Sequence, residues 1–143
     1  MNKNYMEISF MAKLCNVTFS RTVVAGFLMS VDLMLNELNE IKTIVSEAVT
    51  NAIVHGYKED DEKIVYLSLN LTDDVLTMII EDKRCGIQNV AKAREPLFST
   101  KLSEERAGLG FTIMEIFSDD IEVISKVGEG TKVICHKKIT LTD

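Results

Sequence analysis

Three polar residues recur at every fourth position in an otherwise apolar stretch of the sequence: Glu47, Asn51 and His55. Residues spaced by four lie on one face of a helix, so these side chains are expected to be neighbours. The amide oxygen of Asn51 is the kind of hard ligand that Mg²⁺ prefers at nucleotide phosphates, and the carboxylate of Glu47 could accept a proton from an attacking hydroxyl or water. A solvated polar stripe on a helix would show the same spacing, so the pattern alone leaves both interpretations open.

A second candidate residue, Asp82, ends an apolar run, and Gly86 follows it four residues later. Aspartate at the end of a strand commonly starts a turn. In a pocket, however, the same carboxylate could accept a hydrogen bond from the amino group of adenine, which would select adenine over guanine. Both interpretations fit this short segment.

Two glycines, Gly108 and Gly110, stand immediately ahead of an apolar helical run. Glycine lets backbone N–H groups approach phosphate oxygens closely, and a helix N-terminus adds a favourable dipole for an anion. Arg106 beside them could neutralise charge on a terminal phosphate, with help from Lys101. The glycines could also be simple turn residues, because a single Gly-x-Gly is a weak signal.

A glycine turn, Gly128-Glu129-Gly130, leads through Thr131 into the last apolar segment and also fits an ordinary hairpin. The chain lacks the Gly-x-x-x-x-Gly-Lys-Ser/Thr sequence of a P-loop, and it lacks the glycine loop and catalytic-loop signature of protein kinases. A phosphate-transfer enzyme built on this chain would therefore use a different fold.

The elements that would position these residues follow from the hydrophobic pattern. Alternation predicts a strand over Tyr5–Met11, with one face formed by Met6, Ile8 and Phe10. Helical spacing predicts a helix over Asn16–Val31, with an apolar face formed by Phe19, Val23, Phe27 and Val31. A stronger helical pattern runs from Met34 to His55 and stops at Gly56, so it would carry the polar triplet.

In the second half of the chain the pattern predicts a hairpin formed by Ile64–Leu71 and Val75–Glu81. A short helix over Phe111–Phe117 follows, and a second hairpin is formed by Ile121–Val127 and Thr131–Lys138. Between the first hairpin and the helix, the polar stretch Lys83–Ala107 is long enough to be a functional loop. This order of elements predicts an α+β fold: a two-layer α/β sandwich with a mixed, mostly antiparallel sheet and helices on one face.

Size and composition predict one domain over residues 1–143, since the chain is 46% hydrophobic and contains no linker-like segment. A net charge of -6 argues against direct nucleic-acid binding. No apolar run approaches the roughly 20 residues that span a bilayer, and no signal sequence is present, so we expect a cytoplasmic protein without membrane contact. The odd set of cysteines, Cys15, Cys85 and Cys135, predicts buried free thiols.

Taken together, the four glycine and carboxylate elements resemble the sequence boxes of the GHKL (Bergerat) ATP-binding fold in order and spacing. The chain from Met6 to Lys138 is also similar to the sporulation anti-sigma-F factors, most clearly over Glu47–Ile53 with His55-Gly56-Tyr57, Pro96–Phe98 and Gly110–Glu115. This resemblance implies a serine kinase that uses ATP and Mg²⁺. It also implies a homodimer that binds a sporulation sigma factor and phosphorylates a serine of an anti-anti-sigma factor.

By the same resemblance, Glu47 would be the catalytic base, Asn51 the Mg²⁺ ligand and Asp82 the acceptor for adenine. Arg21 would lie on the surface where the two protein partners compete, and Pro96–Ala107 would form an ATP lid. The remaining nucleotide-binding residues would be Gly86, Lys101, Arg106, Gly108, Leu109, Gly110 and Thr131.

One position departs from the family pattern, because Arg84 replaces the first glycine of Asp-x-Gly-x-Gly. If that position requires a positive φ, arginine costs about 1–2 kcal/mol, which would weaken nucleotide binding. An anti-sigma module that binds nucleotide with little or no kinase activity is therefore one alternative. A general-stress anti-sigma kinase, which would differ only in its partners, is another. The catalytic fragment of a histidine kinase would need an upstream dimerisation segment with a phosphoacceptor histidine.

Overall fold

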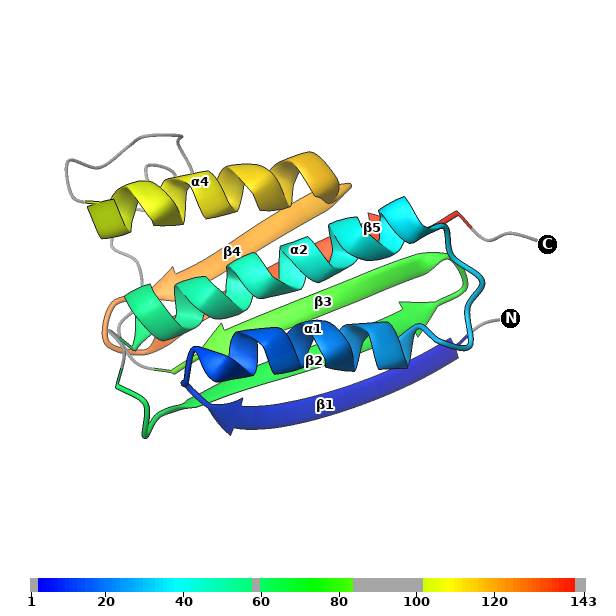
Figure 1. Ribbon diagram of the computed structural model, residues 1–143. Coiled ribbons are helices and arrows are strands. Elements are labelled where there is room, and N and C mark those ends of the chain that lie inside the picture. The colour runs from blue at the N-terminus through cyan, green and yellow to red at the C-terminus, as the bar shows by residue number, and fades with distance from the viewer. Residues whose placement is uncertain (1–2, 58–59, 84–101, 141–143) are drawn as a thin grey trace.

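The computed structural model describes residues 3–57, 60–83 and 102–140, with side chains from residue 109 onward in the last range. Five strands form one sheet and the helices lie together on one side of it, with α2 between α1 and α4 (Figure 1). The elements in chain order are β1 (Lys3–Met11), α1 (Cys15–Phe27), α2 (Leu35–Asn51), the π-helix η1 (Ala52–Gly56), β2 (Ile64–Thr72), β3 (Val75–Asp82), α4 (Leu102–Phe117), β4 (Asp120–Lys126) and β5 (Gly130–Lys138). The predicted α+β sandwich is confirmed.

The sheet has the strand order β1-β2-β3-β5-β4, and its neighbouring strands are antiparallel in every described pair. The antiparallel part of the predicted arrangement is therefore confirmed, and no parallel pair accompanies it among the described strands. In β2 and β3 alternate residues are buried beneath the helices, as the alternating sequence pattern predicts. Three of these side chains, Leu76, Met78 and Ile80, are exposed by 1% or less.

The first strand and helix are present, and of the predicted apolar face Phe27 is buried and Val23 and Val31 are partly buried against the core, whereas Phe19 is not. The helix ends at Phe27 rather than at Val31. In β1 the side chains of Met6, Ile8 and Phe10 are half-buried and the others are exposed, as predicted. The buried face of α1 is formed by Ser20, Val24 and Phe27, whereas Phe19 is 53% exposed. Ser20 can be buried because its hydroxyl donates a hydrogen bond to the carbonyl of Val17 at 2.6 Å.

The long central helix is confirmed, but its last turn is a π-helix rather than an α-helix. The Tyr57 N–H donates to the carbonyl of Ala52 at 3.0 Å, the five-residue spacing of a π-helix. The four-residue spacing that the sequence pattern assumed between Asn51 and His55 therefore does not hold in this turn. π-turns of this kind often occur at functional sites.

The prediction that Gly108 and Gly110 precede a helix is wrong. Helix α4 begins at Leu102, so both glycines lie inside it, and the stretch Leu102–Ala107, which the sequence assigned to a loop, is helical. The residues around the glycines, including Leu, Glu and Arg, are good helix formers that outweigh a glycine penalty of about 1 kcal/mol each. The expected lid residues Pro96–Lys101 lie outside the described residues.

The far end of α4 is fixed by Lys137, which is only 8% exposed. Its ammonium group donates to the carbonyl of Phe117, the last residue of α4, at 2.7 Å, and pairs with the Glu40 carboxylate on α2 at 3.0 Å. A cation at a helix C-terminus also interacts favourably with the helix dipole. One side chain therefore ties β5, α2 and α4 together.

Two smaller findings complete the fold. Cys135 is a buried free thiol, as predicted, but Cys15 is exposed, because it stands at the start of α1, and Cys85 lies outside the described residues. Among the described helices, none is both long enough and apolar enough to cross a membrane.

Candidate functional site

Glu47 and Asn51 lie next to each other on α2, and Gly110 of the neighbouring helix α4 packs against both side chains. A Cβ atom at Gly110 would be 3.0 Å from Oε2 of Glu47 and 3.2 Å from Nδ2 of Asn51. Most real Cβ contacts are longer than this, so a side chain at Gly110 would push the Glu47 carboxylate or the Asn51 amide aside by a few tenths of an ångström. The absence of a side chain at Gly110 thus leaves room for the Glu47–Asn51 pair.

The side chain of Asn51 is buried without a matching interaction for its amide nitrogen. The residue is 9% exposed, and Nδ2 has no hydrogen-bond partner within the described part of the chain. An unsatisfied buried amide costs on the order of 1–3 kcal/mol, so such a group usually has a functional reason. The amide offers an oxygen acceptor and an N–H donor to a bound molecule.

Glu47 is half-buried, and this burial raises the pKa of its carboxyl above the ordinary value of 4.5. Burial disfavours the charged carboxylate, which makes the ionised form a stronger proton acceptor. Glu47 therefore combines a raised proton affinity with an amide neighbour, which is an arrangement suited to general-base chemistry.

Asp82 forms a second part of the site at the end of β3, where it is 4% exposed. The backbone of Gly56 lies against its carboxylate, since a Cβ atom at Gly56 would be 2.9 Å from Oδ1 and closer still to Oδ2. On the neighbouring strand Thr131 pairs with Asp82 in register, and the Thr131 hydroxyl is 2.8 Å from that of Ser125. A carboxylate and a hydroxyl thus face the helix layer side by side.

The π-helix η1 connects the two parts of the site. It begins directly after Asn51, ends at Gly56 against Asp82, and contacts β3, β5 and α4. His55 lies within this segment and is half-buried. The short segment therefore fixes where the Asn51 amide and the Asp82 carboxylate lie relative to each other.

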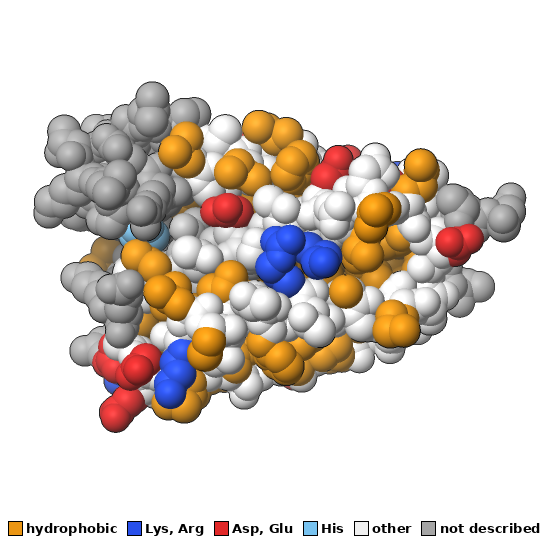
Figure 2. Space-filling model, viewed as in Figure 1, with side chains coloured by type: hydrophobic (Ala, Val, Ile, Leu, Met, Phe, Trp, Pro, Cys, Tyr) orange, Lys and Arg blue, Asp and Glu red, His pale blue; other side chains and the backbone are white. Residues whose placement is uncertain are grey.

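Arg21 is held between α1 and α2, close to the first part of the site. Its guanidinium donates to the Ser46 hydroxyl at 3.0 Å and to the Lys42 carbonyl at 3.3 Å. Figure 2 shows basic side chains together at the middle of the helical face, in the region of α1 and α2. Arg21 is thus partly buried and anchored on the residue that precedes Glu47.

The structure brings together only some of the residues that the sequence predicted for the site. Glu47, Asn51 and Gly110 meet at one place, and Asp82 and Thr131 at the other. Leu109 is 44% exposed, only the backbone positions of Arg106 and Gly108 in α4 are described, and Gly86, Arg84 and Lys101 lie outside the described residues. Sequence reasoning missed Gly56 and Tyr57, although their place directly after the polar triplet was a usable signal.

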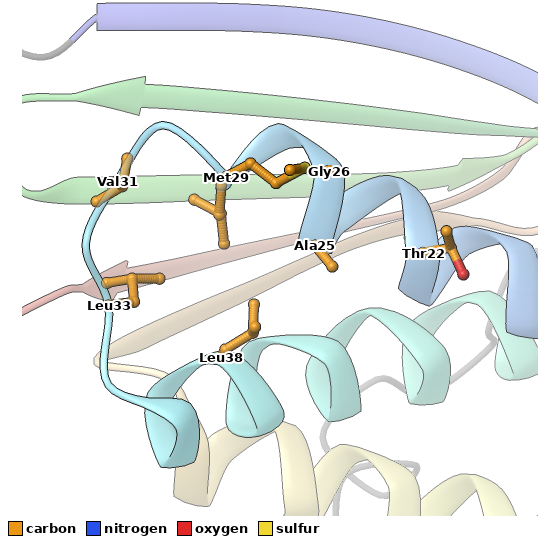
Figure 3. A pocket seen from close by; sticks show the side chains of 8 residues that line it. Thr22, Ala25, Gly26, Met29, Val31, Leu33 and Leu38 are labelled. Carbon is orange, nitrogen blue, oxygen red and sulfur yellow. The ribbon is translucent and has the colours of Figure 1, made fainter.

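A separate apolar groove lies between the end of α1 and the start of α2, with a volume of about 400 Å³. Figure 3 shows apolar side chains facing it from both helices and from the segment that joins them, among them Ala25, Met29, Val31, Leu33 and Leu38. The only hydroxyl on its lining is that of Thr22. Such a surface offers no charge to a phosphate, so the groove is unsuited to the chemistry of the Glu47–Asn51 pair.

Comparisons with known proteins agree with this arrangement. Residues 10–137 match the family described as histidine kinase-like ATPase domain. The anti-sigma F factor of Geobacillus sp. (strain WCH70) is 49% identical over 138 residues, which cover 96% of this chain and 94% of the relative. The anti-sigma F factor of Clostridium beijerinckii is 43% identical over 141 residues, which cover 99% of each chain.

A solved structure supports the fold. The crystal structure of the RsbU and RsbW domains of Rv1364c from Mycobacterium tuberculosis matches 95% of this chain and 32% of that chain, with a TM-score of 0.66 and 15% identity. At that identity the likeness concerns the fold alone. With its family match, its near full-length relatives and this architecture, the chain belongs to the histidine kinase-like ATPase domains and, among them, to the anti-sigma F factors.

Proposed function

We propose that this chain is an anti-sigma factor that sequesters a sporulation sigma factor and uses Mg-ATP to phosphorylate a serine of its anti-anti-sigma antagonist. The observation that supports this most strongly is the Glu47–Asn51 pair beneath Gly110. It joins a buried amide without a partner among the described residues to a carboxyl whose pKa is raised by burial. The similarity to anti-sigma F factors over nearly the whole chain supplies the biological context.

Asn51 fits the role of a magnesium ligand. Mg²⁺ prefers oxygen donors and usually binds through one or two protein groups together with substrate phosphates. The Asn51 amide oxygen would be such a donor, and its Nδ2 lacks a hydrogen-bond partner in the described part of the chain. When bound with ATP, Mg²⁺ would neutralise charge on the phosphate oxygens.

Glu47 would act as the general base. Its carboxylate takes the proton of the acceptor serine hydroxyl, the serine oxygen forms a bond to the γ-phosphorus of ATP, and the bond from that phosphorus to the β,γ-bridging oxygen breaks. The products are phosphoserine, ADP and a protonated Glu47. Burial assists this step because it raises the proton affinity of the Glu47 carboxylate.

Asp82 would recognise the adenine amino group, with the Thr131 hydroxyl beside it. The carboxylate is buried and its position is fixed by the close approach of Gly56. A carboxylate accepts a hydrogen bond from an amino group and repels a carbonyl oxygen at the same place, so it discriminates between bases that present one or the other. Guanine presents a carbonyl where adenine has its amino group, so ATP would be preferred over GTP.

Arg21 would contribute to the surface that binds the protein partners, together with the basic side chains at the middle of the helical face (Figure 2). We also propose that the protein is a cytoplasmic homodimer, and light scattering at micromolar concentration measures that assembly directly. Because Arg21 is hydrogen-bonded to Ser46, a partner that moves Arg21 would also disturb the residue next to Glu47.

The test of this function is calorimetric titration with Mg-ATP and with the purified sporulation sigma factor. We expect saturable binding of both, and no Mg-ATP binding after Asn51→Ala. A protein that binds the sigma factor and ATP but transfers no phosphate would be the nucleotide-binding module that Arg84 favours. A protein that captures a general-stress sigma factor instead would be the related stress kinase.

A further inference from the structure

The hydroxyl of Tyr57 joins three segments that surround Asp82. It accepts a hydrogen bond from the backbone N–H of Lys83 at 2.8 Å and donates one to the carbonyl of Ile64 at 2.6 Å. Tyr57 is 5% exposed and follows directly after η1. The phenol therefore connects the end of the π-helix to the start of β2 and to the residue after β3.

The same place holds Asp82 from two further directions. Gly56 lies against the carboxylate, and Gly130, with a φ of +114°, lies against the Asp82 carbonyl. A Cβ atom added to Gly130 would be 2.6 Å from Cα of Lys83. Neither glycine leaves room for a side chain. Gly56 thus packs against the Asp82 carboxylate, and Tyr57 and Gly130 pack against the Asp82-Lys83 backbone.

The direction of the hydrogen bonds at Tyr57 is fixed by its two partners, because a backbone N–H can only donate and a carbonyl can only accept. Burial raises the pKa of the Tyr57 hydroxyl above its ordinary value of 10.0, and the nearby Asp82 carboxylate adds to this. The phenol therefore keeps its proton at neutral pH, donates to Ile64 and accepts from Lys83. Removing the hydroxyl would leave a buried carbonyl without its donor and a backbone N–H without its acceptor.

We propose that Tyr57 is a positioning residue for recognition of the nucleotide base: its hydroxyl holds the Asp82-Lys83 backbone so that the Asp82 carboxylate meets the amino group of adenine. This inference rests on the proposed function. Tyr57 does not touch the base itself. It acts through Lys83 and Asp82, and because η1 starts after Asn51, it also sets the spacing between the base end and the phosphate end of the site.

The test compares Tyr57→Phe with wild type and with the matched control Tyr66→Phe, which removes a hydroxyl from an exposed tyrosine whose ring contacts the Lys83 ammonium at 4.4 Å. Calorimetry with Mg²⁺ measures affinity for ATP, for GTP and for inorganic triphosphate, which has no base. In Tyr57→Phe we expect the ATP affinity and the ratio of ATP to GTP affinity each to fall about tenfold, a change of about 1.4 kcal/mol. Triphosphate affinity and kcat at saturating ATP should stay unchanged, and Tyr66→Phe should match wild type throughout.

An unchanged ATP-to-GTP ratio in Tyr57→Phe, or an equal loss of triphosphate and ATP affinity, overturns the inference while leaving the proposed function intact. A wild-type protein that binds no ATP overturns both. If Tyr57→Phe does not fold, amide hydrogen exchange of wild-type Lys83 decides. Strong protection of that N–H in the nucleotide-free protein is the expected result, and rapid exchange overturns the inference.

Discussion

The backbone of Gly110 lies against the carboxylate of Glu47, so closely that a Cβ atom would be 3.0 Å from Oε2. The two residues come from different helices, α4 and α2, which pack against each other. The position of α4 therefore affects the position of the proposed catalytic base through the contact at Gly110. The sequence suggested a different role for this glycine, as part of a loop around phosphate.

Gly110→Ala is expected to lower the rate of phosphate transfer by up to about tenfold, because the Glu47 carboxylate must move by a few tenths of an ångström and a misplacement of about 1 Å costs roughly a hundredfold. The matched control is Gly26→Ala in α1, where a Cβ atom would have nothing within 4 Å. The control should keep full activity and gain about 0.5–1 kcal/mol of stability from the better helix propensity of alanine. Initial rates and chemical denaturation measure both effects, and full activity in Gly110→Ala would contradict the contact as described.

Asn51→Ala is expected to remove Mg-ATP binding while changing the free energy of unfolding by less than about 1 kcal/mol, because the buried amide nitrogen has no described hydrogen bond to lose. Asn39→Ala on the exposed side of the same helix is the control and should bind Mg-ATP normally. Calorimetry and thermal melting report binding and stability separately. Unfolding of Asn51→Ala together with loss of binding would mean that Asn51 is a structural residue.

The rate of phosphate transfer should depend on pH through the ionisation of Glu47. Burial raises its pKa above 4.5, and a base works only when deprotonated. The rate is therefore full above the raised pKa and falls as the pH drops through it, so the acid limb should have its midpoint above pH 4.5. ATP affinity measured over the same pH range serves as the control. A midpoint at or below 4.5 would exclude Glu47 as the base.

Lys137→Met is expected to lower the free energy of unfolding by about 2 kcal/mol, because it removes two partly buried hydrogen bonds made by a charged group, to Glu40 and to the Phe117 carbonyl. The control Lys138→Met removes an ion pair with Asp74 at 3.7 Å from a side chain that is 72% exposed, and should change stability by less than about 0.5 kcal/mol. Urea denaturation compares the two variants, and equal losses would show that the tether at the end of α4 adds no stability.

Much of the fold could be predicted from the sequence because its signals are local. The alternation in Val75–Asp82 and the apolar helical spacing before Asn51 both result from burial of one face of the element. The period of the apolar residues therefore predicts the type of element directly. The spacing of Glu47 and Asn51 likewise placed the two side chains together correctly. The burial of these two side chains could not be predicted, because it depends on α4 packing against them.

The errors arose where tertiary contacts override local pattern. Gly108 and Gly110 look like turn residues, yet both lie within α4, and Gly110 is needed there for its small size against Glu47. Phe19 has an apolar side chain at helical spacing, but α1 buries Ser20 instead because the serine hydroxyl is satisfied within its own helix. The π-turn after Asn51 has no local sequence signature.

The most direct test of the central claim is the intact mass of the anti-anti-sigma partner after incubation with this protein and Mg-ATP, with Glu47→Gln as the control. We expect one added phosphate on a serine, formed at a rate that falls by about 10²–10⁴-fold in Glu47→Gln while ATP binding is retained. An unmodified partner, with ATP and the sigma factor still bound, would contradict the kinase assignment.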